Sequence, residues 1–169
     1  MEVRAARPGD AQGIGSAHSE AWRVGFSGLF ESRWLRSAVD DRRDRWSRLL
    51  PECLSGGMEV LVVEADGVVV GFTHFGPCEQ DEEAEEVFAL YVHPDHWGTG
   101  AAQSLSRHAI ERLKKRGIQR IVLWTPFGAN RARAFYERNG WALTGRTSER
   151  DFGDGRPQKL VEYELTRDP

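Results

Sequence analysis

The sequence has few cysteines and no long hydrophobic stretch. Cys53 and Cys78 are the only cysteines among 169 residues, and they lack CxxC spacing and neighbouring histidine pairs. A disulfide framework or a zinc site is therefore not expected, and no metal is assigned. The longest apolar runs, such as residues 68–70 and 121–123, are far shorter than the roughly 20 residues of a membrane-spanning helix. We expect no membrane contact.

The chain also lacks an excess of basic residues. Its 23 Lys and Arg against 26 Asp and Glu give a net charge of −3, and the arginines are scattered among acidic residues. Nucleic acid is therefore not expected as a partner. Residues 1–4 lead directly into charged sequence without an apolar segment, so we expect no secretory signal and a cytoplasmic location.

Length and composition are typical of a folded globular protein. Hydrophobic residues make up 40% of the chain and charged residues 29%. A chain of this size suits one domain, since domains commonly run to roughly 100 to 200 residues. No internal repeat or low-complexity tract divides the chain. The sequence therefore predicts a single domain over residues 1–169.

Hydrophobic periodicity predicts alternating strands and helices. Asp66 and Gly67 lie between two β-branched runs and predict a two-residue hairpin turn. Helices are indicated where apolar residues recur every three or four positions, and Gly117 and Gly140 each end one. The predicted strands cover residues 3–5, 60–63, 68–72, 87–92, 118–125, 142–151 and 159–166, and the predicted helices cover residues 11–23, 40–50, 98–116 and 130–139.

A glycine-rich turn joins a predicted strand to a predicted helix at residues 92–102. Such a turn exposes backbone N–H groups at the positive end of a helix dipole. The small residues Gly98, Gly100, Ala101 and Ala102 let a bulky anion approach the backbone. No Gly-Lys-Ser/Thr ending indicates a P-loop, and the dinucleotide fingerprint lacks its third glycine. The turn is therefore expected to bind a pyrophosphate.

Two segments resemble the signatures of the GNAT acetyltransferase family. Residues 97–102 resemble Arg/Gln-x-x-Gly-x-Gly/Ala after a strand and His93-Pro94, although Trp97 stands where the family has Arg or Gln. Residues 130–141 resemble the second signature, from Asn through Phe-Tyr-Glu to Gly-Phe. The resemblance covers essentially the whole chain. It implies an α/β (α+β) fold: a mixed, mostly antiparallel sheet of about seven strands, about four flanking helices, and a V-shaped split between the fourth and fifth strands.

The resemblance implies an N-acetyltransferase that moves the acetyl group of acetyl-CoA to a primary amine of a small molecule or peptide. Backbone groups of residues 90–92 would bind the pantetheine arm, and Asn130 would contact the coenzyme near it. Tyr136 would protonate the leaving thiolate, a task that suits a positioned phenol. The residues implied for acetyl-CoA binding are Leu90, Tyr91, Val92, Trp97, Gly98, Thr99, Gly100, Ala101, Ala102, Asn130, Phe135 and Tyr136.

The acceptor amine must lose a proton, because an amine with a pKa of about 10 is almost wholly protonated at neutral pH. Glu86 is the predicted general base, since related enzymes often carry a glutamate at the start of this strand. Glu85 is the alternative, because only one of two neighbours on a strand faces the cleft. Neither cysteine adjoins the thioester site, so direct transfer is expected. The acidic run 81–86 would attract a cationic acceptor, and acceptor binding is predicted for Trp22, Arg23, Phe26 and Phe75.

Two alternatives stay open. The chain could be a GNAT-fold module that binds acetyl-CoA or a metabolite without turnover, which Trp97 favours and Tyr136 disfavours. It could also transfer a longer acyl group. Related proteins often form homodimers, so the resemblance implies that this chain could pair with a second copy of itself. The sequence does not identify the acceptor.

Overall fold

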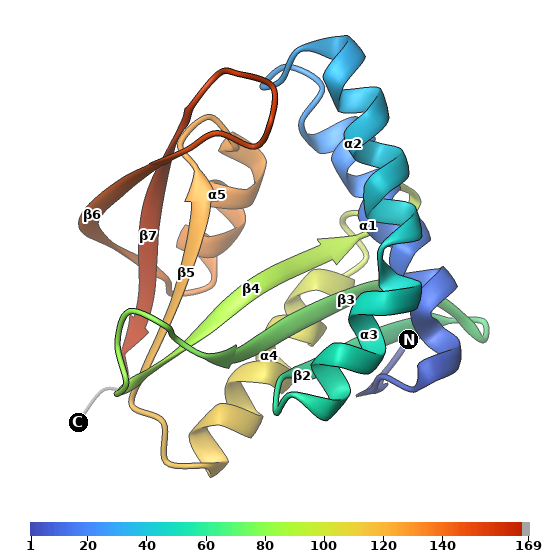
Figure 1. Ribbon diagram of the computed structural model, residues 1–169. Helices are drawn as coiled ribbons and strands as arrows, with labels where there is room; N and C mark the ends of the chain where they lie inside the picture. Colours follow the sequence, from blue (N-terminus) through green and yellow to red (C-terminus); the bar gives the residue numbers. More distant parts are fainter. Residues whose placement is uncertain (167–169) are drawn as a thin grey trace.

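A seven-stranded sheet in the order β1-β2-β3-β4-β5-β7-β6 forms the centre of the computed structural model, which describes residues 1–166 (Figure 1). All neighbouring strands are antiparallel except β4 and β5, which are parallel. The predicted mixed, mostly antiparallel sheet is confirmed. The strands are β1 (Glu2–Ala5), β2 (Glu59–Ala65), β3 (Val68–Pro77), β4 (Ala84–Val92), β5 (Arg120–Pro126), β6 (Ala142–Arg150) and β7 (Gln158–Thr166).

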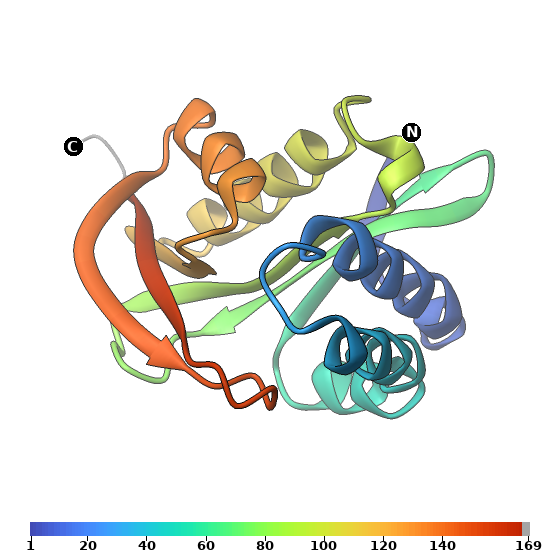
Figure 2. The same cartoon turned by 90° about the horizontal axis from the view of Figure 1, so that it is seen from above.

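Five α-helices cover the two faces of this sheet. Seen from above, α1, α2 and α3 lie together on one side, and α4 and α5 lie on the other (Figure 2). The packing agrees, because Leu105 and Tyr136 contribute to one hydrophobic core and Ile14 and Trp46 to another. The helices are α1 (Ala11–Gly25), α2 (Ser32–Asp44), α3 (Trp46–Ser55), α4 (Ala101–Lys115) and α5 (Asn130–Arg138).

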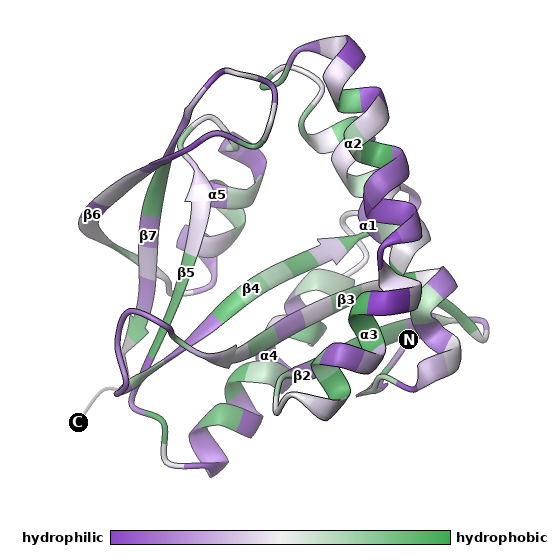
Figure 3. Ribbon diagram, in the orientation of Figure 1, coloured by the Kyte–Doolittle hydropathy of each residue, from purple (hydrophilic) through white to green (hydrophobic). Residues whose placement is uncertain are grey.

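Hydrophobic residues are frequent on β4 and β5, whereas α2 and α5 are mainly hydrophilic (Figure 3). The strands lie between two helical layers, so both of their faces are covered over much of their length. The two helices need only one apolar stripe each. Within residues 1–166, none of the helices combines the length and the apolar character that crossing a bilayer requires.

The region before β2 differs from the predicted single helix over residues 40–50. Its first part ends α2 and its second part lies in α3, with the break at Arg45. The Glu31 carboxylate fixes the start of α2, because it accepts hydrogen bonds from the backbone N–H groups of Arg33 and Trp34. Trp46 is buried, and its Nε1 donates to His18 Nδ1 at 3.0 Å. The break at Arg45 therefore lets α3 take its own direction toward the sheet.

The hairpin predicted at Asp66 and Gly67 is confirmed. Both residues have positive φ angles, 51° and 76°, as a two-residue hairpin turn requires. The turn joins β2 to β3, whose pairing runs from Ala65 opposite Val68 to Glu59 opposite Phe75. Because β3 also pairs with β4, this hairpin fixes the position of the strand that ends at the glycine-rich turn.

β4 and β5 form the V-shaped split predicted between the fourth and fifth strands. They pair at only three positions, where Ala84, Glu85 and Glu86 lie opposite residues 120–122. The rest of β4 pairs with β3 alone, and a β-bulge interrupts that pairing beside Phe88. Residues 87–92 therefore present backbone groups along one unpaired edge.

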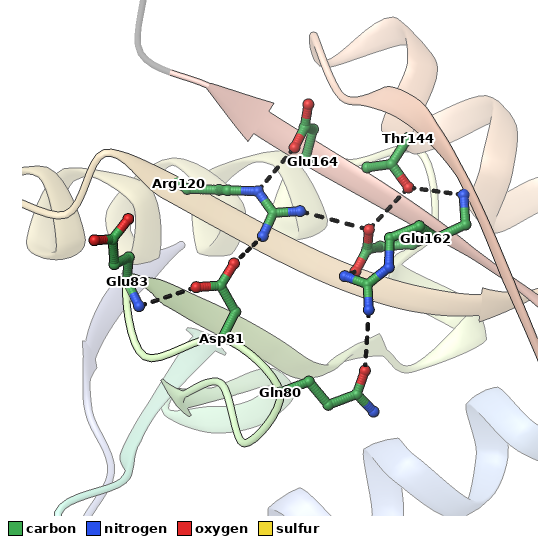
Figure 4. Close-up of polar contacts among 8 residues, drawn as sticks. Gln80, Asp81, Glu83, Arg120, Thr144, Glu162 and Glu164 are labelled. Carbon is green, nitrogen blue, oxygen red and sulfur yellow. Dashed lines mark hydrogen bonds and ion pairs between the residues drawn. The ribbon is translucent and has the colours of Figure 1, made fainter.

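An ion-pair network holds together the closed end of the split (Figure 4). The Glu162 side chain is almost completely buried and accepts hydrogen bonds from Thr144 Oγ1 at 2.8 Å and Arg146 Nη1 at 3.1 Å. Arg120 joins the loop before β4 to β7, since it pairs with three carboxylates, those of Asp81, Glu162 and Glu164. The network therefore connects β5, β6 and β7 to the segment that begins β4.

Replacing Glu162 with Gln should lower the free energy of unfolding by about 1 to 3 kcal/mol, because an amide cannot neutralise the arginines and its NH₂ group would face their donors. Urea unfolding at neutral pH measures this change. Glu164→Gln is the matched control, since its side chain is 30% exposed and also meets Arg120; it should cost less than about 1 kcal/mol. Equal losses in the two variants would contradict the role given to burial.

Candidate functional site

A cavity of about 750 Å³ opens beside the unpaired edge of β4. It lies between that edge, the glycine-rich turn, the start of α4, one face of α5 and the C-terminal half of α1. Its volume is in the range of small-molecule sites. None of its lining residues is Asp or Glu, whereas Arg131, Arg138 and His96 are among them. An anionic ligand therefore meets no opposing carboxylate in this cavity.

The glycine-rich turn leaves its backbone accessible to the cavity. Gly98 and Gly100 have φ angles of 80° and 88°, which non-glycine residues rarely adopt. No heavy atom lies within 4 Å of the point where either glycine would carry a Cβ. Gly100 is the N-cap of α4, so the first free N–H groups of that helix follow it directly. The turn thus presents an open cradle at the positive end of the helix dipole, as a phosphate requires.

The end of β4 forms the wall facing the turn. Leu90, Tyr91 and Val92 all line the cavity, as expected for residues predicted to contact a pantetheine arm. These residues pair with β3 along one edge, and at the end of the strand Trp97 Nε1 donates to the Val92 carbonyl at 2.7 Å. Trp97 therefore satisfies the carbonyl group at the C-terminal end of β4.

Tyr136 lies on the α5 side of the cavity. Its ring is mostly buried between those of Trp141 and Tyr163, with centroid distances of 6.0 Å and 5.8 Å. Within the described residues no hydrogen bond involves its hydroxyl, whereas the Tyr163 hydroxyl donates to Glu137 Oε1 at 2.7 Å. Burial raises the pKa of the Tyr136 phenol. The hydroxyl is consequently protonated at neutral pH and available to donate toward the cavity.

Glu85 and Glu86 point to opposite faces of β4. Glu85 is buried and accepts from Arg116 Nη2 at 2.7 Å, at the C-terminal end of α4. Glu86 lies on the other face, and burial raises the pKa of its carboxyl above the ordinary value. Glu86 is not among the cavity-lining residues, although it occupies the last paired position before β4 and β5 diverge.

The four predicted acceptor residues are not brought together. Phe26 lines the cavity, and Trp22 is buried behind it in an aromatic cluster with Phe30. Arg23 is exposed and bound to Glu20, outside the cavity lining. Phe75 must be corrected: its side chain is completely buried in the core that packs against α4, so a substrate cannot reach it.

Most of the predicted coenzyme residues do line the cavity, including Gly98, Ala101, Ala102 and Phe135. Asn130 and Thr99 do not; Asn130 is exposed at the start of α5, and the Thr99 hydroxyl donates to the His96 carbonyl at 2.7 Å. Other lining residues were not predicted. Among them, Arg131, Ala134 and Arg138 could have been indicated by their spacing on α5, which puts them on the same helix face as the predicted Phe135.

Both cysteines are buried and stand apart from the cavity lining. Cys53 Sγ lies 3.5 Å from His74 Nε2, but burial raises the pKa of the thiol and lowers the pKa of His74 to about 4. The pair is therefore neutral at pH 7 and lacks a thiolate. Residues 1–166 contain no group of three or more His, Cys, Asp or Glu side chains that could hold a metal ion.

Comparison with curated proteins gives relatives of similar length. The chain is 27% identical over 154 residues to a probable N-acetyltransferase of Mycobacterium tuberculosis, covering 87% of this chain and 83% of the relative. It is 31% identical over 173 residues to the L-amino acid N-acyltransferase MnaT of Escherichia coli, covering 99% and 95% respectively.

Solved structures share the fold. The PaiA N-acetyltransferase of Thermoplasma acidophilum, in complex with coenzyme A, matches with a TM-score of 0.76 at 19% identity over 97% of this chain and 98% of its own. YncA of Salmonella typhimurium, with acetyl-CoA, matches with a TM-score of 0.73 at 22% identity over 99% and 94%. The model of the acetyltransferase (GNAT) family matches residues 19–141. The chain therefore belongs to the GNAT family and is an acetyl-CoA-dependent N-acetyltransferase.

Proposed function

We propose that this enzyme transfers the acetyl group of acetyl-CoA directly to a primary amine of a small molecule or peptide, with Tyr136 as the general acid. The observation that carries the proposal is the shared cavity: Tyr136, whose hydroxyl has no hydrogen bond within the described residues, and the open glycine turn line the same space. A phosphate held at the turn therefore has the proton donor within the same cleft. Both cysteines are buried outside the cavity lining, and burial keeps the Cys53 thiol protonated, which supports direct transfer over a covalent acetyl-cysteine route.

The residues present fit coenzyme A. The turn around Gly98 and Gly100 would hold the pyrophosphate, and the free edge of β4 at Leu90 and Tyr91 would hydrogen-bond the pantetheine amides. When bound, acetyl-CoA supplies an activated thioester. A backbone N–H of β4 would polarise the acetyl carbonyl, and Tyr136 would protonate the sulfur as the acceptor amine forms the new C–N bond and the C–S bond breaks.

The acceptor end of the cavity is the part formed by α1. Ala21, Gly25 and Phe26 line it, giving a small apolar surface beside the backbone of β4. A relative of nearly the same length is named an L-amino acid N-acyltransferase. We therefore place the α-amino group of L-amino acids first among the candidate acceptors, ahead of polyamines, aminoglycosides and peptides.

Calorimetric titration with acetyl-CoA, together with thiol release over these four classes of amine, tests the proposal. Binding with amine-dependent thiol release supports direct transfer and identifies the acceptor class. Binding without release for every class would favour a non-catalytic binding module. Competition by longer acyl-CoAs in the same assay tests whether the cavity prefers acetyl over larger acyl groups.

We propose Glu86 as the general base, acting through water because its side chain is set back from the cavity. A base must be ionised to accept a proton. Since burial raises its pKa, activity should fall with decreasing pH at a higher pH than for an ordinary carboxyl. Glu86→Gln should lower kcat/KM roughly 100-fold and remove this acid limb. A pH–rate profile of both proteins provides the measurement.

Glu85→Gln is the matched control for that experiment. Glu85 is the neighbouring carboxylate, but it is bound to Arg116 on the opposite face of the strand. Its replacement should lower stability and leave the acid limb of the profile in place. Loss of the limb in Glu85→Gln, or its persistence in Glu86→Gln, would rule out the assignment.

A further inference from the structure

Trp97 stands where the family signature has Arg or Gln, and the side chain of another residue places a cation over its ring. The guanidinium carbon of Arg131, from the first turn of α5, lies 3.9 Å from the centre of the Trp97 ring. The two residues come from two different elements, the glycine-rich turn and α5, and both line the cavity. The positive charge that an Arg at position 97 would bring is therefore supplied by Arg131 of α5.

The ring that carries this cation is fixed in position. Trp97 Nε1 donates to the Val92 carbonyl at 2.7 Å, and the Trp97 backbone N–H donates to the Pro94 carbonyl at 3.0 Å. An indole held at two points gives the guanidinium a defined surface to lie on, and cation–π attraction favours that position. Because the Arg131 side chain is already ordered by the ring, it loses less conformational entropy when it binds a ligand.

Arg131 keeps its hydrogen-bonding capacity for a ligand. Many arginines of this chain are paired with carboxylates, such as Arg120 with Glu164, whereas among residues 1–166 no ion pair or hydrogen bond involves the Arg131 side chain. A guanidinium over an aromatic face still presents N–H groups along its edges, in the fork that matches a phosphate. The cavity lining contains no carboxylate that could compete for them.

We propose that Trp97 and Arg131 together form the pyrophosphate clamp of this enzyme, with Arg131 donating to the coenzyme phosphate held by the glycine turn. The inference rests on the proposed coenzyme site and assigns a binding role to Arg131, which occupies a variable position within the second signature. It also explains how the turn can tolerate Trp97: the charge has moved to α5, and the indole positions it.

The test is calorimetric titration of coenzyme A against Arg131→Met, which keeps an aliphatic side chain over Trp97 and removes the charge. We expect affinity to fall roughly 10- to 100-fold, as for the loss of a charge-assisted hydrogen bond. The loss should shrink as NaCl is raised, because salt screens the interaction. Arg131→Lys should retain part of the affinity. Arg107→Met, an exposed arginine of α4 outside the cavity, is the charge-matched control and should bind like the wild type.

Dephospho-coenzyme A, which lacks the 3′-phosphate, distinguishes the two phosphate groups. An equal loss for both ligands supports contact with the pyrophosphate, and a loss for coenzyme A alone would overturn it. Affinity of Arg131→Met within twofold of the Arg107→Met control, or a loss independent of salt, would also overturn the clamp. Failure of the wild-type protein to bind coenzyme A would instead refute the proposed coenzyme site itself.

Discussion

Replacing Tyr136 with Phe should lower kcat by roughly 10²- to 10⁴-fold, the usual contribution of a general acid, and leave acetyl-CoA affinity within about twofold. The phenol lines the cavity, has no partner within the described residues, and is kept protonated by burial. Phenylalanine preserves the ring contacts with Trp141 and Tyr163, so the fold should be unaffected. Thiol release with the best acceptor gives the rate, and calorimetry gives the affinity.

Tyr163→Phe provides the matched control for this prediction. Its hydroxyl is engaged by Glu137 and Arg133 and it is absent from the cavity lining. The variant should lose about 1 kcal/mol of stability and keep its rate. A Tyr136→Phe enzyme with unchanged turnover would show that the leaving thiolate takes its proton from elsewhere, for example from water.

The sequence predicted the parts of this protein that depend on local backbone requirements. Positive φ angles at Gly98 and Gly100 are needed whatever surrounds them, and the same holds for Asp66 and Gly67 in the hairpin. The order of strands and helices followed from periodicity, and the two signatures then fixed the fold. Tyr136 was identified because it belongs to one of those signatures.

Features set by packing between distant segments could not be predicted in the same way. Phe75 and Phe26 are both aromatic residues near element ends, yet the alternation of side chains along β3 turns Phe75 toward the α4 core. The division between α2 and α3 depends on the burial of Trp46 against His18. The stacking of Arg131 on Trp97 joins two residues from different elements, and only the tertiary fold brings them together.

The contact between α1 and α2 depends on one such unpredicted feature, the glycine at position 15. A Cβ added to Gly15 would lie 2.2 Å from the backbone carbonyl oxygen of Arg43. The obstacle is backbone, so no side-chain rotation can relieve the clash. The two helices can therefore approach this closely only where α1 carries no side chain. Because Ala21 and Gly25 of α1 line the cavity and Phe26 follows them, the same contact would position the proposed acceptor end.

Gly15→Ala should accordingly lower the free energy of unfolding by about 3 kcal/mol, the upper part of the usual range for overpacking, as a lower urea midpoint with an unchanged m value. Gly25→Ala in the same helix is the control: no atom lies within 4 Å of its Cβ, so it should be neutral or stabilise by up to about 1 kcal/mol. In the folded fraction, Gly15→Ala should raise the KM for the acceptor more than it weakens acetyl-CoA binding, because Phe26 follows α1 directly whereas the glycine turn caps α4. Equal stability of the two variants would mean that α1 and α2 can separate at no cost, and the close crossing would then have no part in shaping the acceptor site.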